Sequence, residues 1–402
     1  MQIASSKTSG RLFFIDAMRA WAILMMLQGH FIDGLLDPAF RNPDNPIYAI
    51  WLYFRGITAP VFFTVSGFIF TYLLVRAPQT GFNNPRVKKG IKRGLQLLLI
   101  GYLLRLNIFG LFMGELYNGF YLVDVLHCIG LSLLTILSLY LLVHNKNKIV
   151  FPAVLLMITL LLFSFEPLYK EWSFGFLPEL IANYFTKSNG SVFTIIPWLG
   201  YAAIGAFISL LFTRFKTHKK LYLVAIPIST VIGLTLILFS SDGFAALYKL
   251  TGVGLFQMIE MNNYLFIRLG DVFVVFAIFM LLRKVMNNKT ILAIGASTLS
   301  IYVIHFVLLY GSFTGLGLYR FFHHGLYPSI AIPGAILFMI ACTYFALQYG
   351  KHETVIKLHV ALLESKGKSL VLNLQKTTVP ILKELHIKVR IILYRLFGFS
   401  RS

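Results

Sequence analysis

Residues 221–240 read LYLVAIPISTVIGLTLILFS, a run without a single charged side chain. A helix of this length rises about 30 Å, which is the thickness of the hydrocarbon core of a bilayer. A helix on the surface of a soluble protein would carry polar residues along its outer face. The stretch therefore predicts a helix that crosses a membrane.

The composition of the whole chain agrees with this prediction. Of the 402 residues, 57% are hydrophobic and 13% are charged, whereas soluble proteins carry about a quarter charged residues. So little charge cannot cover a water-facing surface of this size, which excludes a soluble protein. The net charge of +21 is not carried by a basic globular segment, so it predicts contact with an anionic lipid bilayer and no nucleic-acid partner.

Apolar runs of about 17–25 residues recur along the chain and predict a bundle of about ten transmembrane helices. They lie at 12–32, 49–75, 94–112, 120–143, 149–164, 192–213, 221–240, 263–282, 291–311 and 328–347. Successive loops are assigned to alternate sides of the membrane. The N-terminal segment and the loops on its side hold seventeen Lys and Arg and no acidic residue, and the loops on the other side hold nine acidic and five basic residues. Positive charge marks the cytoplasmic side. The sequence thus predicts an all-α integral membrane protein with both termini in the cytoplasm.

Residues 348–402 are predicted as a cytoplasmic tail that follows a membrane domain of residues 1–347. The tail carries ten Lys and Arg against three Asp and Glu, and its segment 371–399 interleaves aliphatic with basic residues. This pattern is typical of an amphipathic helix that lies on the inner leaflet. The cysteines Cys128 and Cys342 stand far apart in apolar runs, which predicts neither a disulfide framework nor a metal site.

Ionisable side chains inside the predicted spans are few and gather in six of the ten. Because charge in the membrane interior is costly, such residues face a protein interior or a watery cavity and mark functional sites. They are Asp16, Arg19 and His30 in the first span, Arg55 in the second, Arg105 in the third, Asp124 and His127 in the fourth, Arg268 and Asp271 in the eighth, and His305 in the ninth. For the Arg268–Asp271 pair we expect a structural ion pair.

Arg19 and His30 lie on one face of the first predicted helix. They are eleven residues apart, which is about 20° around the axis and about 16 Å along it. Asp16, three residues before Arg19, is near enough to pair with it. One face therefore links a cation in the cytoplasmic half with a titratable base near the outer mouth. The alternative for His30 is a structural hydrogen bond to a neighbouring helix.

Asp124 and His127 are predicted in the outer half of the fourth helix. The carboxylate stands three residues before the imidazole, where it can orient the ring. His305 is expected at a comparable depth, so three imidazoles and a carboxylate predict a site that handles protons. A neutral imidazole is suited to deprotonate an attacking hydroxyl or amine. We therefore take His30, Asp124 and His127 as candidate catalytic residues, with structural roles as the alternative for His127 and His305.

Several segments resemble motifs of the transmembrane acyltransferase superfamily. Its type-3 membrane acyltransferase branch carries Arg-x10-His on the first helix, matched by Arg19 and His30, and FFxxSGF on the next helix, matched at 62–68. Ala20 departs from the glycine that usually follows this arginine. Motifs like those of the heparan-α-glucosaminide N-acetyltransferase-like branch are RGITAPVF (55–62), VDVLHCIGLS (123–132), IPWLGYAAIGAF (196–207) and STLSIYVIHF (297–306). The resemblance covers about residues 11–310.

The resemblance implies a membrane enzyme that moves an acyl group, usually acetyl, from cytoplasmic acyl-CoA to an acceptor on the far side. The implied acceptor is a hydroxyl or amine of a glycan or small molecule, and the implied location is a bacterial cytoplasmic membrane, with no metal. The CoA phosphates need positive charge, and the basic stretch 86–93 is the densest such cluster outside the tail. The candidate donor-binding residues are Arg86, Lys89 and Arg93, and deeper in the membrane Arg19 and Arg105. The alternative for the basic stretch is a role in topology alone.

Two other classes of protein fit part of the sequence. A proton-coupled multi-pass transporter would use the same buried Asp, His and Arg side chains, although no repeated pair of interrupted helices is seen. A non-catalytic scaffold would explain the apolar bulk but not the charged face of the first helix. No GxSxG segment occurs, which argues against a serine acyl-enzyme.

Overall fold

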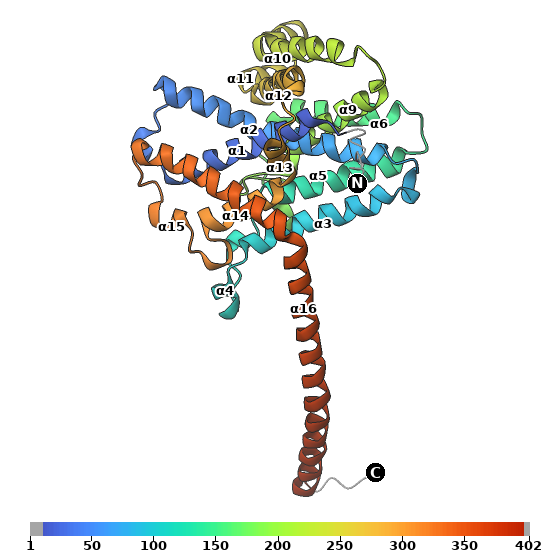
Figure 1. The fold of residues 1–402 in the computed structure, drawn as a ribbon, viewed down its shortest axis with the longest axis vertical. Helices are drawn as coiled ribbons and strands as arrows, with labels where there is room; N and C mark the ends of the chain where they lie inside the picture. The colour runs from blue at the N-terminus through green and yellow to red at the C-terminus, as the bar shows by residue number, and fades with distance from the viewer. Residues whose placement is uncertain (1–10, 398–402) are drawn as a thin grey trace, which may run out of the picture. The chain divides into compact units, whose positions relative to one another are not determined.

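A computed structural model describes residues 11–397, and within this range the chain is helical and contains no β-strand (Figure 1). The prediction of an all-α protein is confirmed. The chain divides into two units, Met1–Ala346 and Leu347–Ser402. The first unit is a helix bundle that contains all the candidate site residues.

Each predicted span falls on helical structure. The long helices are α1 (Phe13–Leu35), α2 (Pro46–Val75), α3 (Pro85–Arg105), α5 (Val125–Val143), α6 (Val150–Ser164), α9 (Ile195–Phe215), α10 (Leu221–Thr251), α12 (Tyr264–Leu281), the pair α13 (Lys289–Ala296) and α14 (Thr298–Tyr310), and α16 (Pro328–Phe397). Short helices occupy the connections: α4 (Ile108–Phe112), α7 (Glu166–Tyr169), α8 (Glu179–Ala182), α11 (Gly254–Met261) and α15 (Leu318–Phe322).

Six helical segments of the described chain are long and apolar enough to cross a membrane, and the bent pair α13–α14 would be a seventh. The protein is therefore an integral multi-pass membrane protein. The remaining helices meet these criteria less well: α1 contains Asp16, Arg19 and Asp33, α3 begins in the basic stretch, and α6 has 15 residues. The count of ten spans and the cytoplasmic termini stay predictions.

Three helix boundaries differ from those predicted. Helix α10 runs to Thr251, eleven residues beyond the predicted end at 240, so much of the predicted loop 241–262 is helical. The other two differ because caps rather than hydrophobicity set them. Helix α3 spans 85–105 and not 94–112: Pro85 occupies its first turn and the Asn84 side chain accepts a hydrogen bond from the backbone N–H of Arg86, as at a typical N-cap. The basic stretch is therefore helical and not a loop. Helix α5 begins at Val125, so Asp124 is its N-cap and does not lie inside the helix.

Glycines allow α2 and α9 to cross in direct backbone contact. Gly67 of α2 lies against the carbonyl of Ala202, and Gly205 of α9 lies against the carbonyl of Thr64. A Cβ atom at either glycine would collide with the opposite backbone. Two of the motif segments, 62–68 and 196–207, thus meet at this crossing and position the centre of the bundle.

Phenylalanine rings from four helices pack around the first half of α1. The Phe14 and Phe212 centroids are 5.7 Å apart, and those of Phe68 and Phe276 are 5.9 Å apart. All four side chains are buried. Helix α1 is therefore held by α2, α9 and α12 at the end that carries Arg19.

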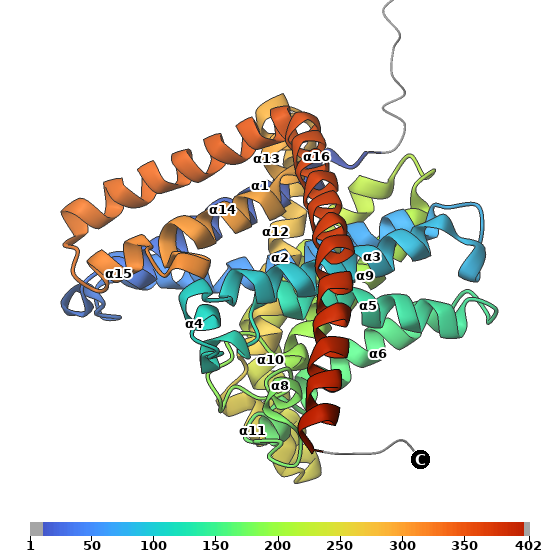
Figure 2. The ribbon, with the colours of Figure 1, turned by 90° about the horizontal axis from the view of Figure 1, so that it is seen from below.

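Helices α13 and α14 follow each other with a bend of 68°. Gly295 near the end of α13 lies directly against the backbone carbonyl of Asp16, and α14 then packs along α1 (Figure 2). Helix α14 ends at Gly311, whose φ of 80° is in the left-handed region that favours glycine. This course places the last turns of α14 beside the last turns of α1.

Helix α16 continues without a break from Pro328 to Phe397, so the tail begins as an extension of the last predicted span. The predicted amphipathic segment 371–399 is helical as far as residue 397, and residues 398 and 399 lie outside the described range. Its position on the inner leaflet stays a prediction.

Candidate functional site

Two histidines and a tyrosine meet at the C-terminal end of α1. His30 Nδ1 lies 2.9 Å from the hydroxyl oxygen of Tyr310, the last residue of α14. The ring centroid of His305, also on α14, is 5.4 Å from that of His30. We call His30, His305 and Tyr310 the imidazole cluster. The structure thus brings the histidines of the first and ninth predicted spans together.

The hydrogen bonds of His305 define which nitrogen is free. Its Nδ1 contacts the backbone carbonyl oxygen of Tyr302, and a carbonyl can only accept, so the neutral ring carries its hydrogen on Nδ1 and a lone pair on Nε2. This Nε2 is buried and has no hydrogen-bond partner among the described residues. A buried acceptor without a partner costs free energy. Such a group is therefore a candidate for contact with a substrate.

Asp124 organises a second group of polar side chains. As the N-cap of α5, it accepts a hydrogen bond at Oδ1 from the backbone N–H of Leu126, and the same oxygen lies 3.2 Å from Nδ1 of His127. Its Oδ2 lies 3.1 Å from Nε of Arg105. We call Asp124, His127 and Arg105 the Asp124 centre. His127 is fully buried, and its Nε2 has no partner among the described residues.

The imidazole cluster and the Asp124 centre occupy the same end of the bundle. Asp124 interacts electrostatically with both His30 and His305. The connection after α14 also contacts the end of α3, because the Ser312 hydroxyl donates to the carbonyl of Leu104, the residue before Arg105. The sequence-predicted layer of three imidazoles and one carboxylate is therefore present as two adjoining groups.

Arg19 lies at the opposite end of α1, with Asp16 and a partner from α14. Its guanidinium donates to the Thr298 hydroxyl at 2.9 Å and lies 3.6 Å from the Asp16 carboxylate. The predicted Asp16–Arg19 pair is confirmed. Asp16 is also paired with Arg11 at 2.6 Å, so this carboxylate is shared between two arginines.

The candidate donor-binding residues separate into two places. Arg86 and Lys89 are exposed on the first turns of α3, and Arg93, one turn further, is partly buried and interacts electrostatically with Arg19. Arg105 lies at the far end of the same helix, in the Asp124 centre. The structure therefore brings Arg93 toward Arg19, whereas Arg105 lies away from Arg19.

Two further ion pairs join α1, α2 and α12. Arg268 and Asp271 pair at 2.9 Å, and the Tyr53 hydroxyl donates to Asp271 at 2.6 Å, which agrees with the predicted structural ion pair. Arg55 of α2 pairs with Asp33 of α1. Arg55 also interacts electrostatically with His30, so it borders the imidazole cluster.

Sequence reasoning did not single out Tyr310, Tyr302 or Thr298. Only contact between α1 and α14 makes Tyr310 and Thr298 partners of His30 and Arg19. Tyr302 contacts His305 within α14, through its backbone carbonyl. One signal was available: Thr298 and Tyr302 belong to the motif segment 297–306, and Tyr302 stands one helical turn before His305.

The fold and the site define an integral membrane protein with a largely buried acid–base cluster at one end of its bundle and a partly buried arginine at the other. A family model described as "Acyltransferase domain" matches residues 12–347. The chain belongs to this family, the type-3 acyltransferases, as the sequence motifs indicated. A search of curated proteins gives no match.

Proposed function

We propose that this acyltransferase moves an acetyl group from cytoplasmic acetyl-CoA to a hydroxyl or amine of a glycan acceptor on the far side of a bacterial cytoplasmic membrane. Family membership supports acyl transfer. The observation that carries the choice of catalytic residue is the contact between His30 and Tyr310, with His305 beside it. This arrangement gives an oriented imidazole of the kind that a general base requires.

In the proposed reaction, His30 Nδ1 donates its hydrogen bond to the Tyr310 oxygen, which leaves the lone pair on Nε2. Nε2 accepts the proton of the acceptor hydroxyl or amine while that oxygen or nitrogen attacks the thioester carbonyl carbon. The new C–O or C–N bond forms, the C–S bond breaks, and the imidazolium returns its proton to the departing thiolate. The Asp124 carboxylate would stabilise the transient positive charge on His30, whereas the guanidinium of Arg55 would oppose it.

The two ends of α1 suggest how donor and acceptor meet. Arg19 and His30 are eleven residues apart, which is about 16 Å along the helix. We place the CoA phosphates at Arg86, Lys89 and Arg93, with Arg19 deeper along the path of the flexible pantetheine arm. Arginine suits phosphate because its guanidinium can bind two oxygens at once. The thioester would then reach the imidazole cluster from the cytoplasmic side.

The test is acyl transfer by the purified protein in proteoliposomes whose protein has its cytoplasmic face outward. Labelled acetyl-CoA is added outside, and a bacterial glycan or lipid extract is enclosed inside. We expect label to leave CoA and to appear in the extract as acetyl ester or amide, as identified by mass spectrometry. The control is Gly243→Ala on α10, which belongs to neither polar group and where an added Cβ would meet nothing within 4 Å. Movement of a solute without consumption of acetyl-CoA would instead indicate a transporter.

A further inference from the structure

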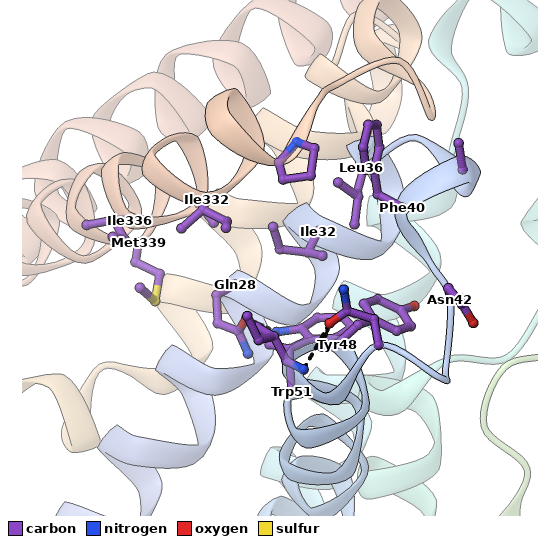
Figure 3. A pocket seen from close by; sticks show the side chains of 15 residues that line it. Gln28, Ile32, Leu36, Phe40, Asn42, Tyr48, Trp51, Ile332, Ile336 and Met339 are labelled. Carbon is purple, nitrogen blue, oxygen red and sulfur yellow. Dashed lines mark hydrogen bonds between the residues drawn. The ribbon is translucent and has the colours of Figure 1, made fainter.

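A cavity of about 710 Å³ lies outside the imidazole cluster, between the last turns of α1, the first turns of α2 and the first turns of α16. Figure 3 shows Ile32 of α1 and Leu36, the residue after this helix, on one side and Ile332, Ile336 and Met339 of α16 on the other. We call this cavity the α1–α16 groove. Its size is in the range of sites that hold one small-molecule ligand.

The two ends of the groove differ in polarity. Asn42, Asn45 and Tyr48 line it where the α1–α2 connection enters α2 (Figure 3). Deeper in, a hydrogen bond of 2.7 Å from Trp51 Nε1 to the Gln28 side-chain oxygen joins α2 to α1, and the facing wall is aliphatic. The rest of the lining is mostly apolar, including Phe40 and Ile47 beside these side chains. Apolar walls with a few polar groups at the α1–α2 connection fit an amphiphile, with its polar head at that connection and its hydrocarbon chain between the helices.

The apolar walls are not covered by the protein itself. Ile332 and Ile336 are 57% and 50% exposed, although both face the groove. They lie on a helix that passes the length and hydropathy test for a membrane span. Inside a bilayer such a surface is covered by a hydrocarbon chain.

Arg55 connects the groove to the imidazole cluster. Its guanidinium carbon lies 6.0 Å from the ring centroid of Trp51, which lines the groove, and its side chain packs beside Gly29, the residue before His30. It also interacts electrostatically with His30 and Tyr310. Arg55 therefore lies between the part of the groove that Trp51 lines and the imidazole cluster.

We propose that the α1–α16 groove binds the hydrocarbon chain of the acceptor, so that the acceptor is a lipid-anchored molecule and not a free glycan. This inference rests on the proposed function, because it assigns the chain to the molecule that His30 deprotonates. The groove lies at the His30 end of α1, whereas the proposed donor enters at the Arg19 end. Its occupant is therefore the acceptor and not the acyl chain of the donor.

Two substitutions on α16 give a matched test. Ile336→Trp places a large ring in the groove, whereas Leu337→Trp places it on the neighbouring face, which is 67% exposed and does not line the groove. Neither site is buried, so both variants should fold. The first readout is photocrosslinking of dodecyl β-D-glucoside with a diazirine in its chain, in phosphatidylcholine nanodiscs. Mass spectrometry then maps the labelled peptides.

We expect crosslinks on 28–51 and 328–339 that excess dodecyl β-D-glucoside removes and methyl β-D-glucoside does not. Ile336→Trp should lower this labelling about tenfold, because the indole ring takes up space that the hydrocarbon chain would occupy; tenfold corresponds to about 1.4 kcal/mol of binding free energy. Leu337→Trp should leave it unchanged. Labelling spread evenly over the lipid-facing helices, or equal in the two variants, would show ordinary bilayer contact and overturn the proposal.

The second readout is the fate of the acetyl label in a membrane extract. We expect it in the solvent-extractable lipid fraction, with a loss of about tenfold in Ile336→Trp and none in Leu337→Trp. Label confined to water-soluble glycan would overturn the groove assignment but keep the proposed function. Specific crosslinking without any acetyl transfer by the unaltered protein would overturn the proposed function but keep the groove as a binding site for a hydrocarbon chain.

Discussion

At the scale of single residues, His30 is the side chain on which the proposed chemistry depends. His30→Ala should lower acetyl transfer about 10²–10⁴-fold, the usual loss when a general base is removed, and leave expression and thermal stability in detergent nearly unchanged. His30→Gln keeps a hydrogen-bonding side chain but should not restore the rate. The measurement is single-turnover transfer of labelled acetyl groups. A fully active His30→Ala together with an inactive His127→Ala would move the base to α5.

Tyr310 is a positioning residue, because its hydroxyl contacts Nδ1 of His30 at 2.9 Å. Tyr310→Phe removes this one hydrogen bond and keeps the ring, so kcat should fall by up to about tenfold, the value of a net hydrogen bond, while KM for the donor stays unchanged. Tyr319→Phe is the control, since the Tyr319 ring packs at a tilt against Tyr310, with the centroids 5.6 Å apart, and is not the hydrogen-bond partner of His30. Equal losses in both variants would indicate a packing effect.

Substitution of Arg19 tests donor binding, provided that its effect on stability is measured separately. Loss of one partner of a buried ion pair commonly destabilises a protein by about 3–5 kcal/mol, but Asp16 would keep Arg11 at 2.6 Å. We therefore expect Arg19→Ala to remain folded and to raise KM for acetyl-CoA, with partial recovery in Arg19→Lys. Thermal stability and KM are measured on the same preparations. A large loss of stability with an unchanged KM would assign Arg19 to the fold alone.

At the scale of elements, the α2–α9 crossing should tolerate no side chain at its glycines. Gly205→Ala places a Cβ against the backbone carbonyl of Thr64, where neither backbone can yield without moving a helix. We expect a fall in the melting temperature in detergent of several degrees and poor expression. Gly243→Ala, which has nothing within 4 Å, should be neutral or slightly stabilising, because alanine favours a helix over glycine by about 1 kcal/mol.

The helices were predictable because runs of apolar residues report membrane burial directly, but the starts of α3 and α5 and the end of α10 were not. The basic turns before residue 94 and the start of α5 depend on the caps Asn84 and Asp124, which a hydropathy count does not register. The Arg19–His30 face follows from helix geometry alone. The partners of these residues on α14 do not, because sequence spacing on one helix contains no information about which neighbour packs against it.

At the scale of the whole molecule, the positions of the polar side chains at alternate ends of successive helices constrain the topology. Five polar side chains gather at one end of the bundle. They are His30 near the end of α1, Arg55 in the first half of α2, Arg105 at the end of α3, Asp124 at the start of α5 and Tyr310 at the end of α14. Helices that run in alternate directions satisfy this arrangement. The predicted charge asymmetry of the loops then places the gathered end away from the cytoplasm.

Cysteine labelling on intact cells tests that orientation. Gln79→Cys, in the connection between α2 and α3, should react with a membrane-impermeant maleimide only after the membrane is opened, whereas Ser173→Cys, after α6, should react from outside. Both positions are exposed, and the native Cys128 and Cys342 are buried. Three of the ten predicted spans separate the two positions, and opposite labelling requires an odd number of crossings between them. Labelling of Gln79→Cys from outside would put His30 on the donor side, where the imidazole cluster could not receive an external acceptor.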